Sequence, residues 1–169
     1  YKYAPPSTNP FDRVTDLDTP HRSNSDLGGV ALNVDWDVGG GTLSAISAWR
    51  YWIWDPSNDR DFLGLPIRTL SQNPSNSYQW PQEVRYAGDF GENLNYVVGA
   101  FWFNQVTKTL GREEQGSAAW RWLTNPTNAN QALGLAGALT GYGQRVEIRS
   151  DHTSQALFGQ LEWKVSDKL

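Results

Sequence analysis

Alternation of apolar and polar side chains, interrupted by connections of two very different lengths, is the feature that most constrains the fold of this chain. Successive side chains of a β-strand face opposite sides, so a period of two indicates strands with one apolar face and one polar face. The alternation predicts strands near residues 28–38, 42–54, 78–90, 94–106 and 153–165. Tight Gly-containing turns join the first strand to the second and the third to the fourth, and long polar loops separate these pairs.

Tight turns at one end of the strands and long loops at the other are the organisation of barrels whose strands cross a membrane. We expect tight turns near residues 39, 92 and 167, and long extracellular loops at 1–26, 55–77 and 109–151. The predicted fold class is all-β: an antiparallel transmembrane β-barrel segment with about five strands of a larger barrel. A half-buried antiparallel sheet in a soluble sandwich shows the same alternation and remains the alternative.

Composition alone would suggest an ordinary soluble domain, with 38% hydrophobic and 19% charged residues. No stretch approaches the roughly 18 consecutive apolar residues of a transmembrane helix, but a transmembrane strand needs only about 9–11 residues, of which every second one meets lipid. The nine Trp residues fit aromatic girdles at both membrane interfaces. We expect one girdle near the tight turns (Trp36, Tyr86, Phe90, Tyr96, Trp163) and one near the long loops (Trp49, Tyr51, Trp52, Trp54, Trp80, Trp102).

Several chemistries are disfavoured. The absence of Cys excludes disulfides and Cys-based metal sites, and a net charge of -4 without basic clusters argues against nucleic-acid binding. His21 and His152 have no ligand-spaced partners, and DPSNDRD (55–61) lacks the spacing of a calcium loop, so it is interpreted as a solvated loop. We therefore expect no catalytic residues, no metal, no cofactor and no enzymatic activity. The absence of Met suggests that Tyr1 is the edge of a processed or excised polypeptide.

The charges of the predicted strands fall mostly on one parity, which would face the barrel lumen. Strand 94–106 is apolar on both faces, and we expect its Tyr96 face to meet lipid. The charges serve either as contacts to a plug or hydrated substrate path, or simply as cross-strand pairs. The predicted lumen-facing residues are Asp35, Asp37, Arg50, Glu83, Arg85, Glu162 and Lys164.

The longest predicted loop contains aromatic and basic residues that lipid contact does not explain. Trp120 and Trp122 lie near Arg112 and Arg121, a combination that suits stacking on an extracellular ligand and pairing with its anionic groups. Packing of loop against loop is the alternative interpretation. Residues 132–139 (ALGLAGAL) could form a short helix, although Gly residues weaken that prediction.

Four motifs in order resemble the barrel of TonB-dependent outer-membrane receptors. In that family a strand ending in Asp-Trp-Asp or similar turns into Gly-Thr-Leu-x-Ser-Ile-x-Ala-Trp/Tyr-Arg, which is matched at residues 41–50. A Gln-Glu-x-Arg strand matches residues 82–85, a Val-x-Gly-x-Phe/Tyr-x-Phe strand matches 97–103, and an Ala-x-Phe-Gly-Gln strand matches 156–160. The similarity covers residues 28–169, so residues 1–26 are expected to be the tail of a loop and 27–169 a partial barrel domain.

The resemblance implies active uptake of a scarce nutrient across the bacterial outer membrane, without chemical change to it. Ferric siderophores, cobalamin and oligosaccharides are the ligand classes implied. The implied partners are outer-membrane lipid, an extracellular small-molecule or metal-chelate ligand, and a TonB-type energy-coupling protein that acts through a plug domain absent from this sequence. A passive porin-type or adhesin barrel and a soluble Trp-rich carbohydrate-binding β-sandwich remain the alternatives.

Overall fold

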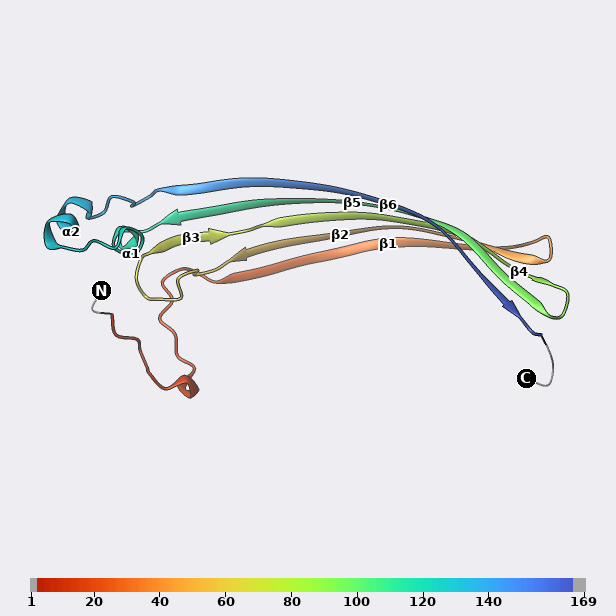
Figure 1. Cartoon of the computed structure of the whole chain (residues 1–169), viewed down its shortest axis with the longest axis horizontal. Helices are drawn as coiled ribbons and strands as arrows, with labels where there is room; N and C mark the ends of the chain where they lie inside the picture. The colour runs from red at the N-terminus through yellow and green to blue at the C-terminus, as the bar shows by residue number, and fades with distance from the viewer. Residues whose placement is uncertain (1–2, 166–169) are drawn as a thin grey trace. The chain divides into compact units, whose positions relative to one another are not determined.

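The computed structural model describes residues 3–165 and confirms an all-β chain whose strands form a mainly antiparallel sheet (Figure 1). The strands are β1 (Arg22–Val38), β2 (Gly41–Ser57), β3 (Arg68–Gln72), β4 (Ser75–Phe90), β5 (Leu94–Gln115) and β6 (Gly143–Trp163). Three short helices lie outside the sheet: the 3₁₀ turn η1 (Pro10–Asp12), α1 (Ala119–Thr124) and α2 (Ala129–Leu135). α2 overlaps the short helix that the sequence suggested.

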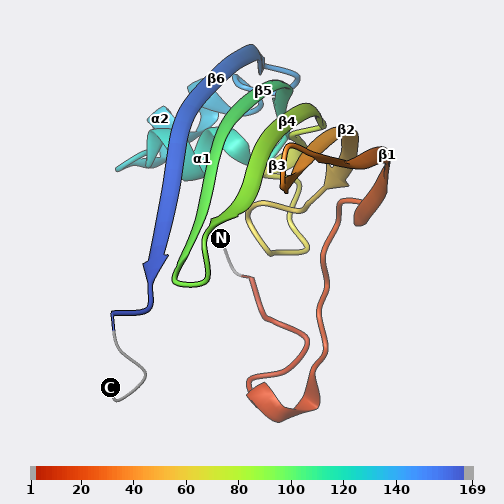
Figure 2. The same ribbon diagram turned by 90° about the vertical axis from the view of Figure 1, so that its right-hand side faces the viewer.

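The strands lie side by side in the order β1-β2-β4-β5, and β6 pairs with the other edge of β5 (Figure 2). Within residues 3–165 the sheet does not close, because β1 and β6 each have one hydrogen-bonded neighbour. Six strands replace the predicted five, since β3 lies inside the segment that the sequence analysis assigned to a loop. The structure therefore shows an open antiparallel sheet.

The strands extend further than the alternation predicted. β1 begins at Arg22, β5 continues to Gln115 and β6 starts at Gly143, so the predicted loops 1–26 and 109–151 are too long. The extensions of β1 and β5 are mostly polar on both faces, which removes the period-two signal without weakening the backbone ladder. In β6 the apolar Val146 and Ile148 alternate with charged residues, but on the parity opposite to that of Leu157 and Leu161, so the apolar face of 153–165 does not continue into the extension. The predicted turn near residue 167 lies outside the described residues.

β3 and β4 follow one another along the same edge of β5. Gln72 of β3 lies opposite Arg112, and the Leu110 amide donates to the Pro74 carbonyl at 2.9 Å. Pro74 itself has no amide to donate, and it lies between the two strands. The predicted loop 55–77 is therefore shortened to residues 58–67, and β3 and β4 form one interrupted edge after it.

The chain divides into two compact units. Unit 1 contains residues 1–25, 54–75 and 109–148, and unit 2 contains residues 26–53, 76–108 and 149–169. The long connections thus gather in unit 1, while the two tight turns of the described residues, β1–β2 and β4–β5, lie at one end of the strands of unit 2 (Figure 1).

The apolar core is very small. Among residues 3–165, the buried apolar side chains are those of Ile67, Ala119 and Pro56, and all three belong to unit 1. Among residues 3–165, the buried residues of unit 2 are two serines, Ser44 and Ser77. A sheet of long strands with no apolar core of its own needs its surroundings to cover its apolar side chains.

The turn between β1 and β2 is held by a side chain from another hairpin. The Tyr86 hydroxyl of β4 donates to the Val38 carbonyl at 2.9 Å and approaches the Gly39 carbonyl at 3.3 Å. The Tyr86 ring also lies against that of Tyr96, with centroids 6.0 Å apart. These contacts join the two hairpins at the turn end of unit 2.

The close approach of Phe158 to Gly99 gives a stability prediction. A Cβ at Gly99 would lie 2.3 Å from the Phe158 ring, whereas one at Gly159 would meet nothing nearer than 3.4 Å. We expect Gly99→Ala to lower the free energy of unfolding by about 1 kcal/mol because the ring must leave its place. Urea unfolding of the folded protein measures this change.

The matched control is Gly159→Ala on the partner strand, which should leave stability unchanged or raise it. In a Phe158→Ala background the cost of Gly99→Ala should vanish, because the clashing ring is gone. Equal costs for Gly99→Ala in the two backgrounds would contradict this account of the contact.

Candidate functional site

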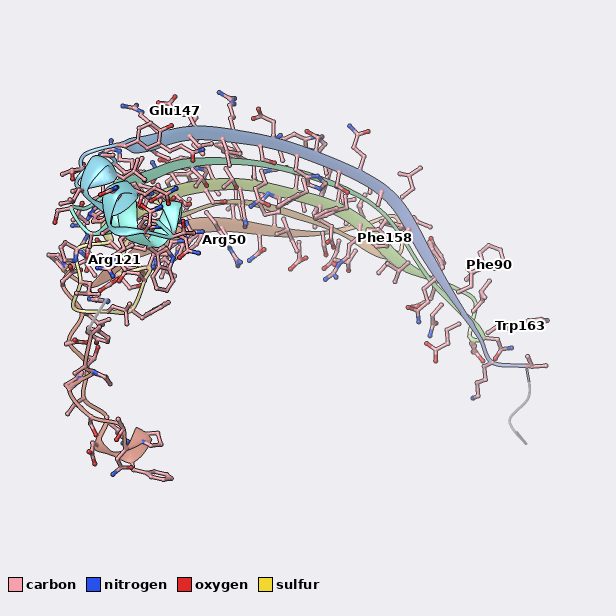
Figure 3. The ribbon with its side chains drawn as sticks, turned by 60° about the vertical axis from the view of Figure 1, so that its left-hand side comes forward. Arg50, Phe90, Arg121, Glu147, Phe158 and Trp163 are labelled. Carbon is pink, nitrogen blue, oxygen red and sulfur yellow. The ribbon has the colours of Figure 1, made fainter. Side chains whose placement is uncertain are left out.

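The sheet of unit 2 has two chemically different faces, which cross-strand contacts define independently of the sequence pattern. On one face, here called the polar face, Ser44 donates to Asp35 at 2.5 Å and Thr42 donates to Asp37 at 2.8 Å. Further along it the Ser77 and Thr107 hydroxyls lie 3.1 Å apart. Figure 3 shows Arg50 and Phe158 on one side of the sheet and Phe90 and Trp163 on the other.

The opposite face, here called the apolar face, carries the row Val30, Leu32, Val34, Trp36 and Val38 of β1. These side chains remain exposed in the isolated chain, with Val30 at 67%, Leu32 at 62% and Trp36 at 63%. Tyr96 shares this face with Tyr86, because their rings are in contact. The structure thus places strand 94–106 with its Tyr96 side on the apolar face.

The seven residues predicted to face the lumen do not converge on one site. Asp35 and Asp37 bond to hydroxyls of the neighbouring strand, and Arg85 lies 3.9 Å from Glu83 on its own strand. Glu162 is exposed at the end of β6, and the backbone amide of Lys164 donates to the Asn93 carbonyl at 2.8 Å. Asp37 lines a shallow hollow at the β1–β2 turn and Glu83 lines a second hollow formed by β4, β5 and β6, whereas Arg50 lines the groove described next.

Arg50 lines an open groove of about 760 Å³ on the sheet of unit 2. The groove is bounded by residues of β1, β2, β4 and β5, including Trp52, Ser77, Gln79, Gln105 and Thr107. Sequence reasoning assigned Trp52 to a lipid girdle, but a residue two positions from Arg50 shares its face of the strand. That girdle assignment is therefore wrong for Trp52, and the alternation itself could have corrected it.

An aromatic cluster on β5 and β6 was missed by sequence reasoning. The rings of Phe101 and Phe103 stack with centroids 6.3 Å apart, and His152 lies 6.1 Å from Phe103. Phe158 covers Gly99 on the same pair of strands. The signal was available in the sequence, because Phe101 and Phe103 share the parity opposite to Tyr96.

In unit 1 the loop segments pack around Asp59, which is fully buried. Its carboxylate accepts hydrogen bonds from the backbone amides of Asp18, Asp61 and Phe62, each at 3.1 Å. The interpretation of residues 55–61 as a solvated loop is therefore wrong at Asp59. The physical reason is that loop amides without ladder partners need acceptors, and a buried carboxylate satisfies three of them.

Two further carboxyl groups lie beside Asp59, and together with it they are here called the Asp59 cluster. The pKa values of both are raised. Burial raises the pKa of Asp61, whose carboxylate accepts from the Arg68 amide at 2.8 Å, and burial likewise raises the pKa of Asp18. The nearby negative charge of Asp59 adds to both shifts. On the other side of this region, Glu113 of β5 pairs with Arg60 and, at 2.6 Å, with Arg68.

The four residues predicted to contact an extracellular ligand lie on two different elements. Trp120, Arg121 and Trp122 belong to α1, while Arg112 belongs to β5 opposite β3. Trp122 is 59% exposed and Trp120 is half-buried, as expected for helix positions two apart, which point in different directions. The two indoles therefore do not form one stacking platform.

The helix α1 is anchored by packing between loops. Ala119 at its start is fully buried, and the amides of Gly116 and Ala118 donate to the carbonyls of Ile67 and Pro66. Trp122 and Arg121 lie on the exposed part of the helix. Of the predicted set, these two on α1 and Arg112 on β5 are exposed to solvent, whereas Trp120 is half-buried.

Among residues 3–165, no three His, Cys, Asp or Glu side chains are grouped so that they could hold a metal ion. Within the same residues, none of the helices is both long and apolar enough to span a bilayer. Searches against protein-family models, curated proteins and solved structures found no match to this chain.

The raised pKa values of Asp18 and Asp61 in unit 1 predict an unusual response to pH. A folded-state pKa above the ordinary Asp value of 3.8 means that the closed cluster binds protons more tightly than the opened one. The cluster should therefore become more stable as the pH falls from about 7 toward the raised pKa values. Amide hydrogen exchange at Asp61 and Phe62, corrected for intrinsic rates, should slow over this range.

Asp18→Asn is the matched variant, because it keeps an oxygen to accept from Thr19 and removes one titrating charge. The pH response should become smaller in this variant. Faster corrected exchange on acidification of the unmodified protein would contradict the prediction.

Proposed function

We propose that this chain forms part of the wall of an outer-membrane β-barrel of the TonB-dependent receptor class, which takes up a scarce nutrient by energy-coupled transport. The observation that carries the proposal is the exposed row of apolar side chains on one face of unit 2. The other face carries carboxylates, hydroxyls and amides. A lipid-facing wall around a wet interior needs this division.

Water is an unfavourable environment for the apolar face. Burial of apolar surface is worth about 25 cal/mol per Å², and soluble monomers rarely expose long rows of large apolar side chains. A second protein layer or a lipid bilayer would satisfy the row equally well. Tight turns at one end of unit 2, with long connections gathered in a separate unit, favour the bilayer.

The sequence of β6 also suggests where the lipid contact would end. Leu157, Leu161 and Trp163 share a parity with residues 145–151 of the same strand, where Arg145 pairs with Glu147 at 2.5 Å and Arg149 with Asp151 at 2.8 Å. Charged pairs on the parity that is apolar further along suit a strand that leaves the bilayer and continues into water. About 9–11 residues suffice for crossing, and β6 has 21.

The receptor class itself rests on the motif order, which places four family-like segments on β2, β4, β5 and β6. The resemblance supplies what the geometry does not: a plug domain, a TonB-type partner, and a ligand such as a ferric siderophore, cobalamin or an oligosaccharide. Trp122 and Arg121 on the exposed side of α1 are candidates for the first contact with that ligand. Transport would leave the ligand chemically unchanged, so no catalytic residue is assigned.

Single-cysteine labelling tests the lipid contact directly, because the chain contains no Cys. Leu32→Cys and Asn33→Cys, labelled with a fluorophore and reconstituted in vesicles, are a matched pair of neighbours on opposite faces of β1. We expect brominated lipid to quench the label at residue 32 and aqueous iodide to quench the label at residue 33. Val34→Cys should repeat the result of residue 32.

A soluble sandwich predicts that brominated lipid quenches neither label and that the unmodified protein unfolds cooperatively without detergent. Either result would overturn the membrane assignment.

Loss of the proton gradient separates a receptor from a passive channel: a protonophore should stop uptake while leaving binding at the cell surface intact. Continued uptake would assign the chain to a passive barrel instead.

A further inference from the structure

We infer that the groove around Arg50 binds an anionic saccharide. This inference rests on the proposed function, and it names the class of substrate that the polar face of unit 2 would contact. The groove lies entirely within unit 2, and its volume of about 760 Å³ falls in the range of small-molecule sites. Three features of its lining carry the inference: a cation without an ion pair, neutral hydrogen-bonding groups and an exposed indole.

The guanidinium of Arg50 has no ion pair with any residue from 3 to 165, and no carboxylate lines the groove. Arg85, on the same face of the sheet, instead lies 3.9 Å from Glu83. An unpaired guanidinium in a carboxylate-free groove complements an anionic group, which it can bind with two parallel N–H donors. The groove is therefore selective for negative charge.

Neutral polar groups lie beside this cation on β4 and β5. The Gln105 amide donates to the Ser77 hydroxyl at 3.0 Å, and Ser77 and Thr107 bond to each other, which fixes all three side chains. Gln79 lines the same groove, and its side-chain amide makes no hydrogen bond with any of residues 3–165. Hydroxyl and amide groups that both donate and accept match the hydroxyls of a sugar ring.

Trp52 gives the groove an aromatic surface. The Trp52 residue is 41% exposed and lines the groove beside Arg50 on β2. Gly29 lies opposite Arg50, and a Cβ there would come within 3.0 Å of the Arg50 Cγ atom and 2.5 Å of the Trp49 carbonyl oxygen, so this glycine lets β1 and β2 approach closely. An exposed indole at the edge of a groove provides stacking area for the C–H face of a sugar.

The test uses the native protein in mild detergent and isothermal titration with two matched probes. These are α-1,4-linked trigalacturonate and the neutral α-1,4-linked galactotriose, which differ only in their carboxylates. We expect the acidic sugar to bind more tightly, and Arg50→Gln to weaken its binding by roughly tenfold or more with little effect on the neutral sugar. Arg50→Lys should restore part of the affinity, and Trp52→Leu should weaken both sugars.

Arg85→Gln is the matched control, because it removes a cation from the same face outside the groove. Equal effects of Arg85→Gln and Arg50→Gln would show a diffuse charge effect and overturn the site. Equal binding of the two sugars, or binding of neither, would also overturn it. The labelling of residues 32 and 33 remains a separate readout: lipid quenching without sugar binding would reject only the groove, whereas sugar binding without lipid quenching would reject only the membrane assignment.

Discussion

The hydrogen-bonded ladder between β1, β2, β4, β5 and β6 is the constraint on which the rest of the structure depends. Backbone pairing fixes the strands, and the pleat then assigns every side chain to one of two faces. The chain supplies no second layer for unit 2 among residues 3–165, so both faces of its sheet remain open. The chemistry of each face therefore describes the environment that the face is built to meet.

The two units solve different physical problems. Unit 2 relies on backbone pairing and on its surroundings, whereas unit 1 holds irregular loops together with polar contacts. Buried Asp59 satisfies three loop amides, and Glu113 joins Arg60 and Arg68. Loops of this kind need internal acceptors because they have no ladder to pair their amides.

The strands of unit 2 could be predicted because alternation is a local signal. Each of the four predicted segments 28–38, 42–54, 78–90 and 94–106 lies within an observed strand, and only the end of 153–165 extends past β6. The extension of β5 was not predicted because it is mostly polar on both faces and leaves no period. The extension of β6 was missed because its apolar residues, Val146 and Ile148, lie on the parity opposite to those of 153–165. β3 was not predicted because it is short and mostly polar, and because Pro74 separates it from β4.

The sites depended on information that one sequence does not carry. Arg50 was identified as a polar-face residue, but the groove around it requires the register of four strands at once. Asp59 was predicted to be solvated because the segment that packs on it is distant in the sequence. That segment contains Asp18, whose amide donates to the Asp59 carboxylate, and His21, which accepts from the Asp59 amide. Trp120 and Trp122 were predicted to act together because they are close in the sequence. In the structure both lie on the helix α1, where residues two positions apart point in different directions.

The contact of Tyr86 with the β1–β2 turn has a consequence for the order of assembly. The hydroxyl reaches carbonyls 47 and 48 residues earlier in the chain, so the first hairpin acquires this bond only after the second hairpin has docked. Non-local contacts of this kind slow folding because loop closure must precede them. The first hairpin can therefore form early without the Tyr86 hydrogen bonds at its turn, and these bonds form once β4 has paired with β2.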